Sequence, residues 1–330
     1  MPRTKTICLI GCAFNLCIAE GADAAETAER DLFQVGWLAD ETTDGFERRE
    51  WLFTYRNHRR DMSWPWEESK AKDFDWGVDL RRNTGSSGDD GFEAHRFAGM
   101  LGKRFSPGLY AEVWLGNHRL DAPSRDASIT TYEATVRLTA GDALDVRVQT
   151  GRDYLYREAF LPAGVTDLLA GRTHSVGLLW RPQPRLRAVG NVERRSLDDG
   201  NTGRRYAFSL LYGISPDWPW IWIGVGGEWL GYDEQRAGYW SPDDFRSVGV
   251  RLQAAFPLSE RIEADASVNV DQLDESDIGT GDGQYLEAGL TYSLTPTLRL
   301  RLNAQRVNSL QAGDRWSETI YLLSLAGALL

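Results

Sequence analysis

The stretch 298–305 reads LRLRLNAQ and places an apolar residue at every second position, with charged or polar residues between. The stretch 262–270, IEADASVNV, alternates in the same way. A helix would scatter Arg299 and Arg301 around its surface, because its side chains repeat every 3.6 residues, whereas a strand places alternate side chains on opposite faces. Both stretches therefore predict β-strands with one apolar face and one polar face.

Segments of this kind recur from about residue 31 to the end of the chain, separated by clusters of Gly, Pro, Asp, Ser and Asn. The connections alternate in length, because 105–108 and 294–297 are tight whereas 151–171, 232–245 and 271–283 are long and polar. Short turns at one end and long loops at the other are typical of outer-membrane barrels. We therefore predict an all-β fold, a transmembrane antiparallel β-barrel of about 16 strands, near 31–39, 49–57, 73–83, 91–104, 109–120, 127–139, 143–152, 172–181, 185–195, 203–214, 220–232, 246–257, 261–271, 284–294, 298–308 and 317–330.

Composition agrees with a barrel and excludes a helical membrane protein. Hydrophobic residues make up 42% of the chain and charged residues 26%. No stretch after residue 30 approaches the roughly 18 unbroken apolar residues of a spanning helix. A barrel can carry this many charges because only alternate residues face lipid. The alternative is a secreted β-sandwich or propeller, whose dry core would not accept so many charges. The segment 57–73 is long for a periplasmic turn and leaves room for a short helix.

The first residues have the features of a secretory leader. Arg3 and Lys5 form a positive region, residues 6–19 are mostly apolar, and 22–24 read Ala-Asp-Ala before a mature chain beginning at Ala25. We predict a signal peptide over 1–24, a barrel domain over 25–330 and an outer-membrane location. The run Leu-Ile-Gly-Cys at 9–12 also fits a lipoprotein box, but it leaves a short apolar core. All three cysteines precede residue 25, so the mature chain lacks thiol chemistry.

The alternation also assigns the two faces of the wall. A charge on the lipid face costs up to about 2–4 kcal/mol at mid-bilayer, so polar residues are expected in the lumen. A barrel of about 16 strands is wide enough to hold water. We expect a hydrated, mixed-charge lumen, with a substrate path that includes the charged residues Glu112, Glu133, Glu228, Arg251, Glu263, Asp265, Glu287, Arg299 and Arg301 and the inward aromatic residues Tyr110, Trp114, Trp222 and Tyr285.

Other aromatic residues cluster near the ends of the predicted strands. Trp and Tyr favour the lipid headgroup level, where one part of the ring is apolar and another reaches water. The sequence predicts an aromatic girdle made of Trp180, Tyr212, Trp218, Trp220, Trp229, Tyr232, Tyr292 and Trp316.

One long connection carries an unusual motif for a solvated loop. It contains Tyr239, Trp240, Ser241 and Pro242, followed by Phe245 just before the strand predicted at 246–257. The motif and the sixteen-strand plan resemble the C-terminal barrels of bacterial exopolysaccharide exporters, the cellulose secretion channel and the poly-N-acetylglucosamine porin. The resemblance implies that these five residues also line a path for an exported polysaccharide.

The chain departs from that family in one respect. The exporters carry tetratricopeptide repeats before the barrel, whereas no 34-residue helical repeat is visible here. The partners implied are outer-membrane lipid and lipopolysaccharide, the polysaccharide, a separate periplasmic repeat scaffold and an inner-membrane synthase. The net charge of -11 argues against a nucleic-acid partner.

Motifs for an enzyme or a bound cofactor are not apparent. The histidines have no serine nucleophile in a known context, and zinc and phosphate-binding motifs are missing. The residues Asp271, Asp274, Asp277 and Asp282 form an acidic loop without the spacing of a calcium site. We therefore expect neither an enzyme nor a cofactor. Three functions stay open: a polysaccharide exporter, a general diffusion porin with an inward third or fourth long loop, and a barrel enzyme or adhesin.

Overall fold

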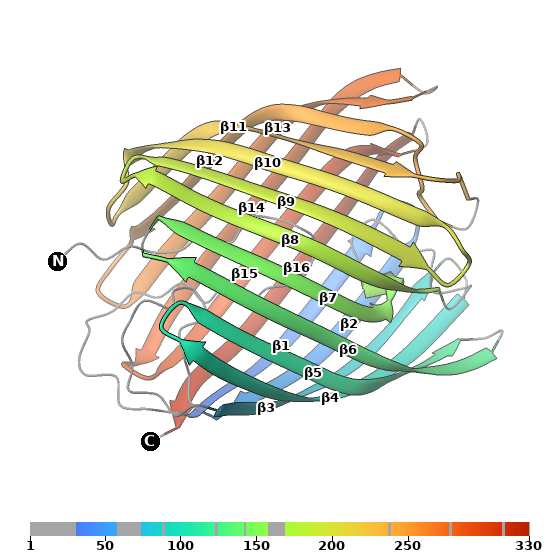
Figure 1. Ribbon diagram of the computed structural model, residues 1–330, viewed down its shortest axis with the longest axis horizontal. Helices are drawn as coiled ribbons and strands as arrows, with labels where there is room; N and C mark the ends of the chain where they lie inside the picture. The colour runs from blue at the N-terminus through green and yellow to red at the C-terminus, as the bar shows by residue number, and fades with distance from the viewer. Residues whose placement is uncertain are drawn as a thin grey trace.

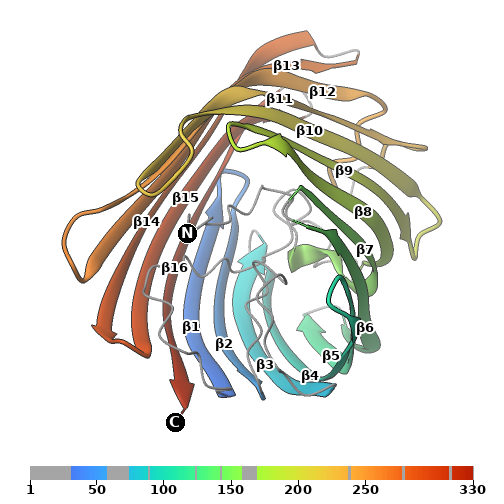
Figure 2. The same cartoon turned by 60° about the vertical axis from the view of Figure 1, so that its left-hand side comes forward.

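The computed structural model describes residues 31–57, 74–87, 90–122, 125–141, 143–157, 169–236, 239–276, 279–311 and 314–329. The predicted signal peptide, the three cysteines and nearly all of the predicted turn 57–73 lie outside these ranges. Sixteen strands form a closed antiparallel barrel in which each strand pairs with its neighbours in the chain and β1 pairs with β16 (Figure 1). Figure 2 shows the strands closing into a ring. The predicted fold is confirmed.

The strands and the single described helix have the following bounds. They are β1 Asp31–Thr42, β2 Phe46–Arg56, β3 Phe74–Ser87, β4 Asp90–Ser106, β5 Leu109–Ala122, β6 Arg125–Ala140, β7 Leu144–Tyr154, the 3-10 turn η1 Leu155–Arg157, β8 Ala170–Gln183, β9 Leu186–Leu197, β10 Thr202–Ser215, β11 Trp220–Tyr232, β12 Phe245–Pro257, β13 Ile262–Glu275, β14 Gly279–Thr295, β15 Leu298–Gln311 and β16 Asp314–Leu329. No helix in the described part of the chain is long and apolar enough to cross a membrane.

Several strands run further than the sequence predicts. The predicted long loop 271–283 is a tight hairpin, because β13 continues to Glu275 and β14 begins at Gly279. Asp271 is an inward strand residue that pairs with Arg251, and Asp282 lies in β14. The prediction of an acidic loop is therefore wrong for Asp271, Asp274 and Asp282, which are strand residues, whereas Asp277 lies outside the described residues. Charged side chains end the apolar belt, but they do not interrupt the backbone hydrogen bonds that extend the hairpin beyond it.

Exposure separates the inner face of the wall from the outer face. The outward Leu115 and Leu302 are 60% and 51% exposed, as expected of side chains that face lipid. On the other face, side chains from strands that are not neighbours touch one another. Arg56 of β2 reaches Glu112 of β5, and Arg187 of β9 reaches Gln253 of β12. Such contacts are possible only across the inside of the barrel.

The predicted aromatic girdle is only partly formed. Trp180 and Tyr212 are outward-facing and each is 48% exposed. Trp220, Tyr232 and Trp316 are buried on the inner face, which makes their assignment to the girdle wrong. Closeness to a strand end sets the depth of a residue in the membrane, whereas the strand register sets the face on which it lies.

A glycine makes room for one of the inner ion pairs. Gly289 of β14 lies between β13 and β15, directly under the pair that Asp265 forms with Arg301. A side-chain carbon added at this glycine would lie 2.5 Å from an Asp265 oxygen and 2.7 Å from an Arg301 nitrogen. The glycine therefore lets an ion pair bridge two strands across the one between them.

Candidate functional site: the lumen and its mouth

Topology identifies the two ends of the barrel. β1 starts opposite the end of β16, with Asp31 paired to Leu329, so both strands reach the same end of the barrel. The long connections β7–β8 and β11–β12 lie at the other end. In outer-membrane barrels the short turns are periplasmic and the long loops extracellular. We call the inner side of the extracellular end the mouth, and the inner wall between the mouth and the periplasmic turns the mid-lumen.

Ion pairs cover much of the mid-lumen. Asp79 accepts hydrogen bonds from Arg96 at 2.6 Å and from Arg81 at 2.9 Å, and Arg81 also reaches Glu50 at 2.9 Å. All four side chains are largely buried. Opposite charges therefore neutralise one another along the wall while keeping it hydrophilic.

The predicted charged residues lie on this inner face, and most have named partners. The pairs are Glu112 with Arg56 at 3.3 Å, Glu133 with Arg147 at 3.8 Å, Glu228 with Arg205 at 2.7 Å, Arg251 with Asp271, Asp265 with Arg301 at 2.9 Å, and Glu287 with Asn303 at 2.8 Å. Glu263 and Arg299 occupy inward positions of β13 and β15 and are partly buried. The lumen therefore presents neighbouring charges of both signs.

The four predicted inward aromatic residues are bound to the same network. Tyr110 and Trp114 donate hydrogen bonds to Glu112 at 3.1 and 3.3 Å. Tyr285 donates to Glu287 at 2.7 Å. The guanidinium of Arg56 lies 5.0 Å from the Trp114 ring centre, and that of Arg187 lies 4.5 Å from the Trp222 ring centre. Each tryptophan therefore already has a cation over one ring face.

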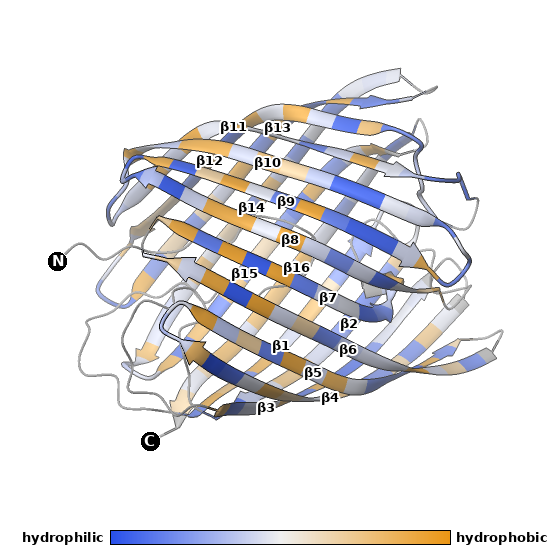
Figure 3. Cartoon of the chain, viewed as in Figure 1, coloured by the Kyte–Doolittle hydropathy of each residue, from blue (hydrophilic) through white to orange (hydrophobic). Residues whose placement is uncertain are grey.

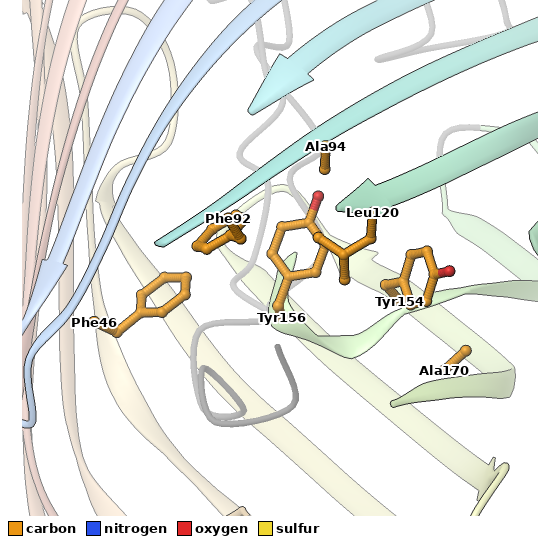
Figure 4. Packing of buried hydrophobic residues seen from close by; sticks show 7 residues of the cluster. All are labelled: Phe46, Phe92, Ala94, Leu120, Tyr154, Tyr156 and Ala170. Carbon is orange, nitrogen blue, oxygen red and sulfur yellow. The ribbon is translucent and has the colours of Figure 1, made fainter. Parts of the chain in front are cut away.

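The β7–β8 connection turns inward at the mouth. Tyr154 and Tyr156, on either side of the start of η1, are 2% and 1% exposed. Tyr156 meets the ring of Phe92 edge-on, with centroids 5.3 Å apart. These residues belong to the first mouth cluster (Figure 4), which consists of Phe46, Phe92, Ala94, Leu120, Tyr154, Tyr156 and Ala170. The cluster joins η1 to β2, β4 and β5, so η1 lies against the inner wall.

A polar contact fixes the same turn. His118 of β5 is fully buried, with one ring nitrogen 2.5 Å from Asp153 and the other 2.9 Å from the Tyr156 hydroxyl. The sequence does not reveal this contact, because His118 is more than 30 residues from Asp153 and Tyr156 in the chain. Only the closed barrel brings the three residues together. The burial of His118 gives it a role in positioning the turn.

A second mouth cluster lies on the opposite side of η1. It consists of Leu155, Leu169, Leu197, Tyr232 and Tyr239. Tyr239 is 6% exposed; its hydroxyl donates to Asp199 at 3.0 Å and accepts from the Asn201 amide at 2.8 Å. Burial raises the pKa of the Tyr239 phenol, and its hydrogen bond to Asp199 acts in the same direction. The turn η1 therefore contributes to both mouth clusters.

The rest of the aromatic motif lies against the rim. Trp240 donates a hydrogen bond to Glu275 of β13 at 3.1 Å and meets Phe245 edge-on at 5.0 Å. The Ser241 hydroxyl accepts the Arg236 amide at 2.7 Å, and the Pro242 carbonyl accepts the Tyr232 amide at 2.8 Å. The motif therefore folds back on the barrel, and its half-buried Trp240 stands beside the inward residue Glu275.

The arrangement combines two kinds of inner surface. Its mid-lumen offers charges of both signs at short intervals, and its mouth is narrowed by apolar side chains from two connections. Within the described ranges, no group of three or more His, Asp or Glu side chains is placed to hold a metal ion.

Comparison with known proteins bears on the fold. No family model and no curated protein matches the sequence. A solved structure recorded as "Bacterial polysaccharide outer membrane secretin" superposes with a TM-score of 0.73 at 10% identity, over 92% of this chain and 99% of that one. CdiB from Acinetobacter baumannii superposes with a TM-score of 0.51 at 8% identity, over 90% of this chain and 60% of that one. OpdO from Pseudomonas aeruginosa gives 0.48 at 13% identity, over 92% and 98%. The chain has the fold of an outer-membrane β-barrel, and this supports an outer-membrane location.

Proposed function

We propose that this barrel exports an exopolysaccharide, a poly-N-acetylglucosamine-like or cellulose-like chain, across the outer membrane. The likeness of nearly the whole chain to the polysaccharide secretin carries the proposal, because the two structures superpose with a TM-score of 0.73 over 92% of this chain and 99% of that one. The name of that protein refers to a polysaccharide, and applying it to this chain is our inference. A separate periplasmic scaffold and an inner-membrane synthase would deliver the polymer.

The mid-lumen chemistry supports such a cargo. Paired charges keep water on the wall without leaving a strong field of one sign, so a neutral or weakly charged sugar chain is neither held nor repelled. Hydroxyl and amide groups of the sugars can exchange hydrogen bonds with carboxylates and guanidinium groups as they pass. The half-buried ring of Trp240 at the mouth provides an apolar surface for a sugar ring, whereas Trp114 and Trp222 are each only 7% exposed and have an arginine over one ring face.

The position of η1 favours a second candidate, a general diffusion porin. In such a porin an inward loop sets the size limit for small solutes. Here η1, at the start of the fourth extracellular connection, lies against the inner wall, and its residues Leu155 and Tyr156 are each 1% exposed. The two candidates differ in whether the lumen interacts with a polymer or admits small solutes without distinction.

Conductance across planar bilayers tests the choice. Export predicts that cello-oligosaccharides or partly deacetylated N-acetylglucosamine oligomers block the current for longer as the oligomer lengthens. A Trp240→Ala variant should shorten the blockades, because its half-buried ring stands at the mouth, whereas the outward Trp180→Phe should leave them unchanged. A steady, highly conducting channel that is indifferent to both oligomers would contradict export and favour the diffusion porin.

A further inference from the structure

The outer face of β8, β9 and β10 carries a row of cationic side chains. In the strand register His174 stands opposite Arg194, and Arg194 stands opposite Arg204. One step further from the periplasm, Arg152 of β7 stands opposite Arg172 of β8. His174, Arg172, Arg194 and Arg204 are exposed. We call these four residues the outward cationic row.

Arg194 opposite Arg204 and Arg152 opposite Arg172 place like charges directly against one another, which destabilises a sheet. Two carboxylates reduce the repulsion at the two ends of the row. Asp198 pairs with Arg152 at 2.8 Å, and Asp233 pairs with Arg204 at 3.3 Å. Within the part of the chain that the structure describes, Arg172 and Arg194 have no ion-pair partner. Among the described residues, no carboxylate therefore neutralises the positive charge of Arg172 and Arg194.

The row lies where the apolar belt ends. The outward residues one step closer to the periplasm are Val148, Val176, Val192 and Tyr206, each between 46% and 49% exposed. Tyr206 lies beside Trp229, with ring centroids 5.1 Å apart, which is typical of the headgroup level. In Figure 3, hydrophilic segments of β9 and β10 lie towards one end of the barrel. It is the end opposite to the one at which β1 starts and β16 finishes. The cationic row is thus level with the headgroups of the outer leaflet.

A comparable row on β3, β4 and β5 provides an internal contrast. There Arg82, His95 and Arg119 also stand side by side on the outer face. However, Arg82 and His95 both reach Glu93, at 2.8 and 3.1 Å, and Arg119 reaches Asp121 at 2.7 Å. Carboxylates of the protein therefore neutralise this second row. A row of basic side chains at the same depth in the membrane need not lack carboxylate partners.

We propose that the outward cationic row binds the phosphate groups of an outer-leaflet glycolipid of the lipopolysaccharide type. Neighbouring strands are about 4.8 Å apart, so His174, Arg194 and Arg204 converge within about 10 Å on one or two phosphates. Guanidinium groups bind phosphate oxygens in a bidentate manner, and the acyl chains would lie along the valine and tyrosine residues below. A second copy of the chain does not suit the row, because two such rows repel. The proposal depends on the outer-membrane location and not on the exported cargo.

Binding of lipid A to the whole barrel in zwitterionic micelles tests the proposal. Diphosphorylated lipid A should bind at least tenfold more tightly to the native chain than to a triple Arg172→Gln, Arg194→Gln, Arg204→Gln variant. The double Arg82→Gln, Arg119→Gln variant is the matched control and should stay within twofold of the native affinity. Lipid A stripped of its phosphates should not distinguish the three proteins. Equal loss in both variants would overturn the proposal, and so would stripped lipid that binds the native chain as tightly as the diphosphorylated lipid does.

Thermal unfolding shows whether the triple variant loses lipid A binding only because it folds poorly. Without lipid A, the triple variant should unfold at the same temperature as the native chain or higher, because like-charge repulsion has been removed. With lipid A, the native chain should gain more than the variant. The proposal is wrong if the variant is less stable without lipid and gains as much with it. It is also wrong if inorganic phosphate alone gives the full stabilisation. The same holds if the native chain is a dimer and the triple variant is a monomer, because the row would then bind a second copy of the chain.

Discussion

The mid-lumen and the mouth cover the same inner wall with different chemistry. The mid-lumen consists of ion pairs between side chains of the wall itself, such as Asp79 with Arg96. The mouth consists of apolar side chains, several of which come from the connections, such as Tyr156 and Tyr239. The difference indicates a division of roles, in which wall pairs stabilise the barrel while the connections control passage. Changes in the mid-lumen should therefore act on stability, and changes in the mouth on conductance.

Removal of a shared carboxylate in the mid-lumen should have the largest effect. Asp79→Ala leaves Arg96, which is 10% exposed, without its closest carboxylate. It also removes one of the two carboxylates that pair with Arg81. Loss of one partner of a buried pair costs about 3 kcal/mol. We expect the unfolding free energy in micelles, measured with urea, to fall by that amount.

The matched control is Glu93→Ala on the outer face. Its pair with Arg82 has side chains 40% and 60% exposed, and such exposed pairs contribute about 0–1 kcal/mol. If both variants lose equally little, water in the lumen screens the inner pairs as fully as bulk solvent does, and the stabilising role of the mid-lumen fails.

A substitution in the first mouth cluster should affect the current more than the fold. Tyr156→Ala removes a side chain that is 1% exposed and its contact with His118, and such burial stabilises by about 2 kcal/mol. We expect η1 to leave the wall, with a larger single-channel conductance and little change in global unfolding. Tyr156→Phe keeps the packing and should stay near the native conductance. An unchanged current in Tyr156→Ala would show that the turn does not narrow the mouth.

The contrast between the two regions also explains what sequence could predict. Strand number and the inward position of Arg301 follow from local alternation, which is visible in the run 298–305. Partnership between His118 and Tyr156 depends on the closed sheet and on an inward bend of the connection, neither of which leaves a periodic signal. The prediction for Trp220 failed for the same reason, since a strand end does not by itself reveal the face.

The aromatic motif allows a finer test of the mouth. Trp240→Ala removes a half-buried ring and one hydrogen bond to Glu275, a loss of about 1 kcal/mol. Assembly should be intact, the current carried by small ions should change little, and blockades by sugar oligomers should shorten. Failure of the variant to assemble would instead make the motif a structural element of the rim.

Tyr239 should give the smallest effect, and one that depends on pH. Because burial raises its pKa above the ordinary value of 10.0, the phenol is protonated in both docked and free loops below about pH 10. Above that pH the phenol of a free loop ionises first, which shifts the equilibrium away from docking. The native conductance should therefore rise as pH passes 10. Tyr239→Phe cannot ionise, so its conductance should show a smaller rise, although the lost hydrogen bonds to Asp199 and Asn201 weaken docking by about 1 kcal/mol at every pH. Identical pH profiles for both proteins would show that the second mouth cluster does not limit the current, and that the narrowing of the mouth depends on Tyr156 and its neighbours.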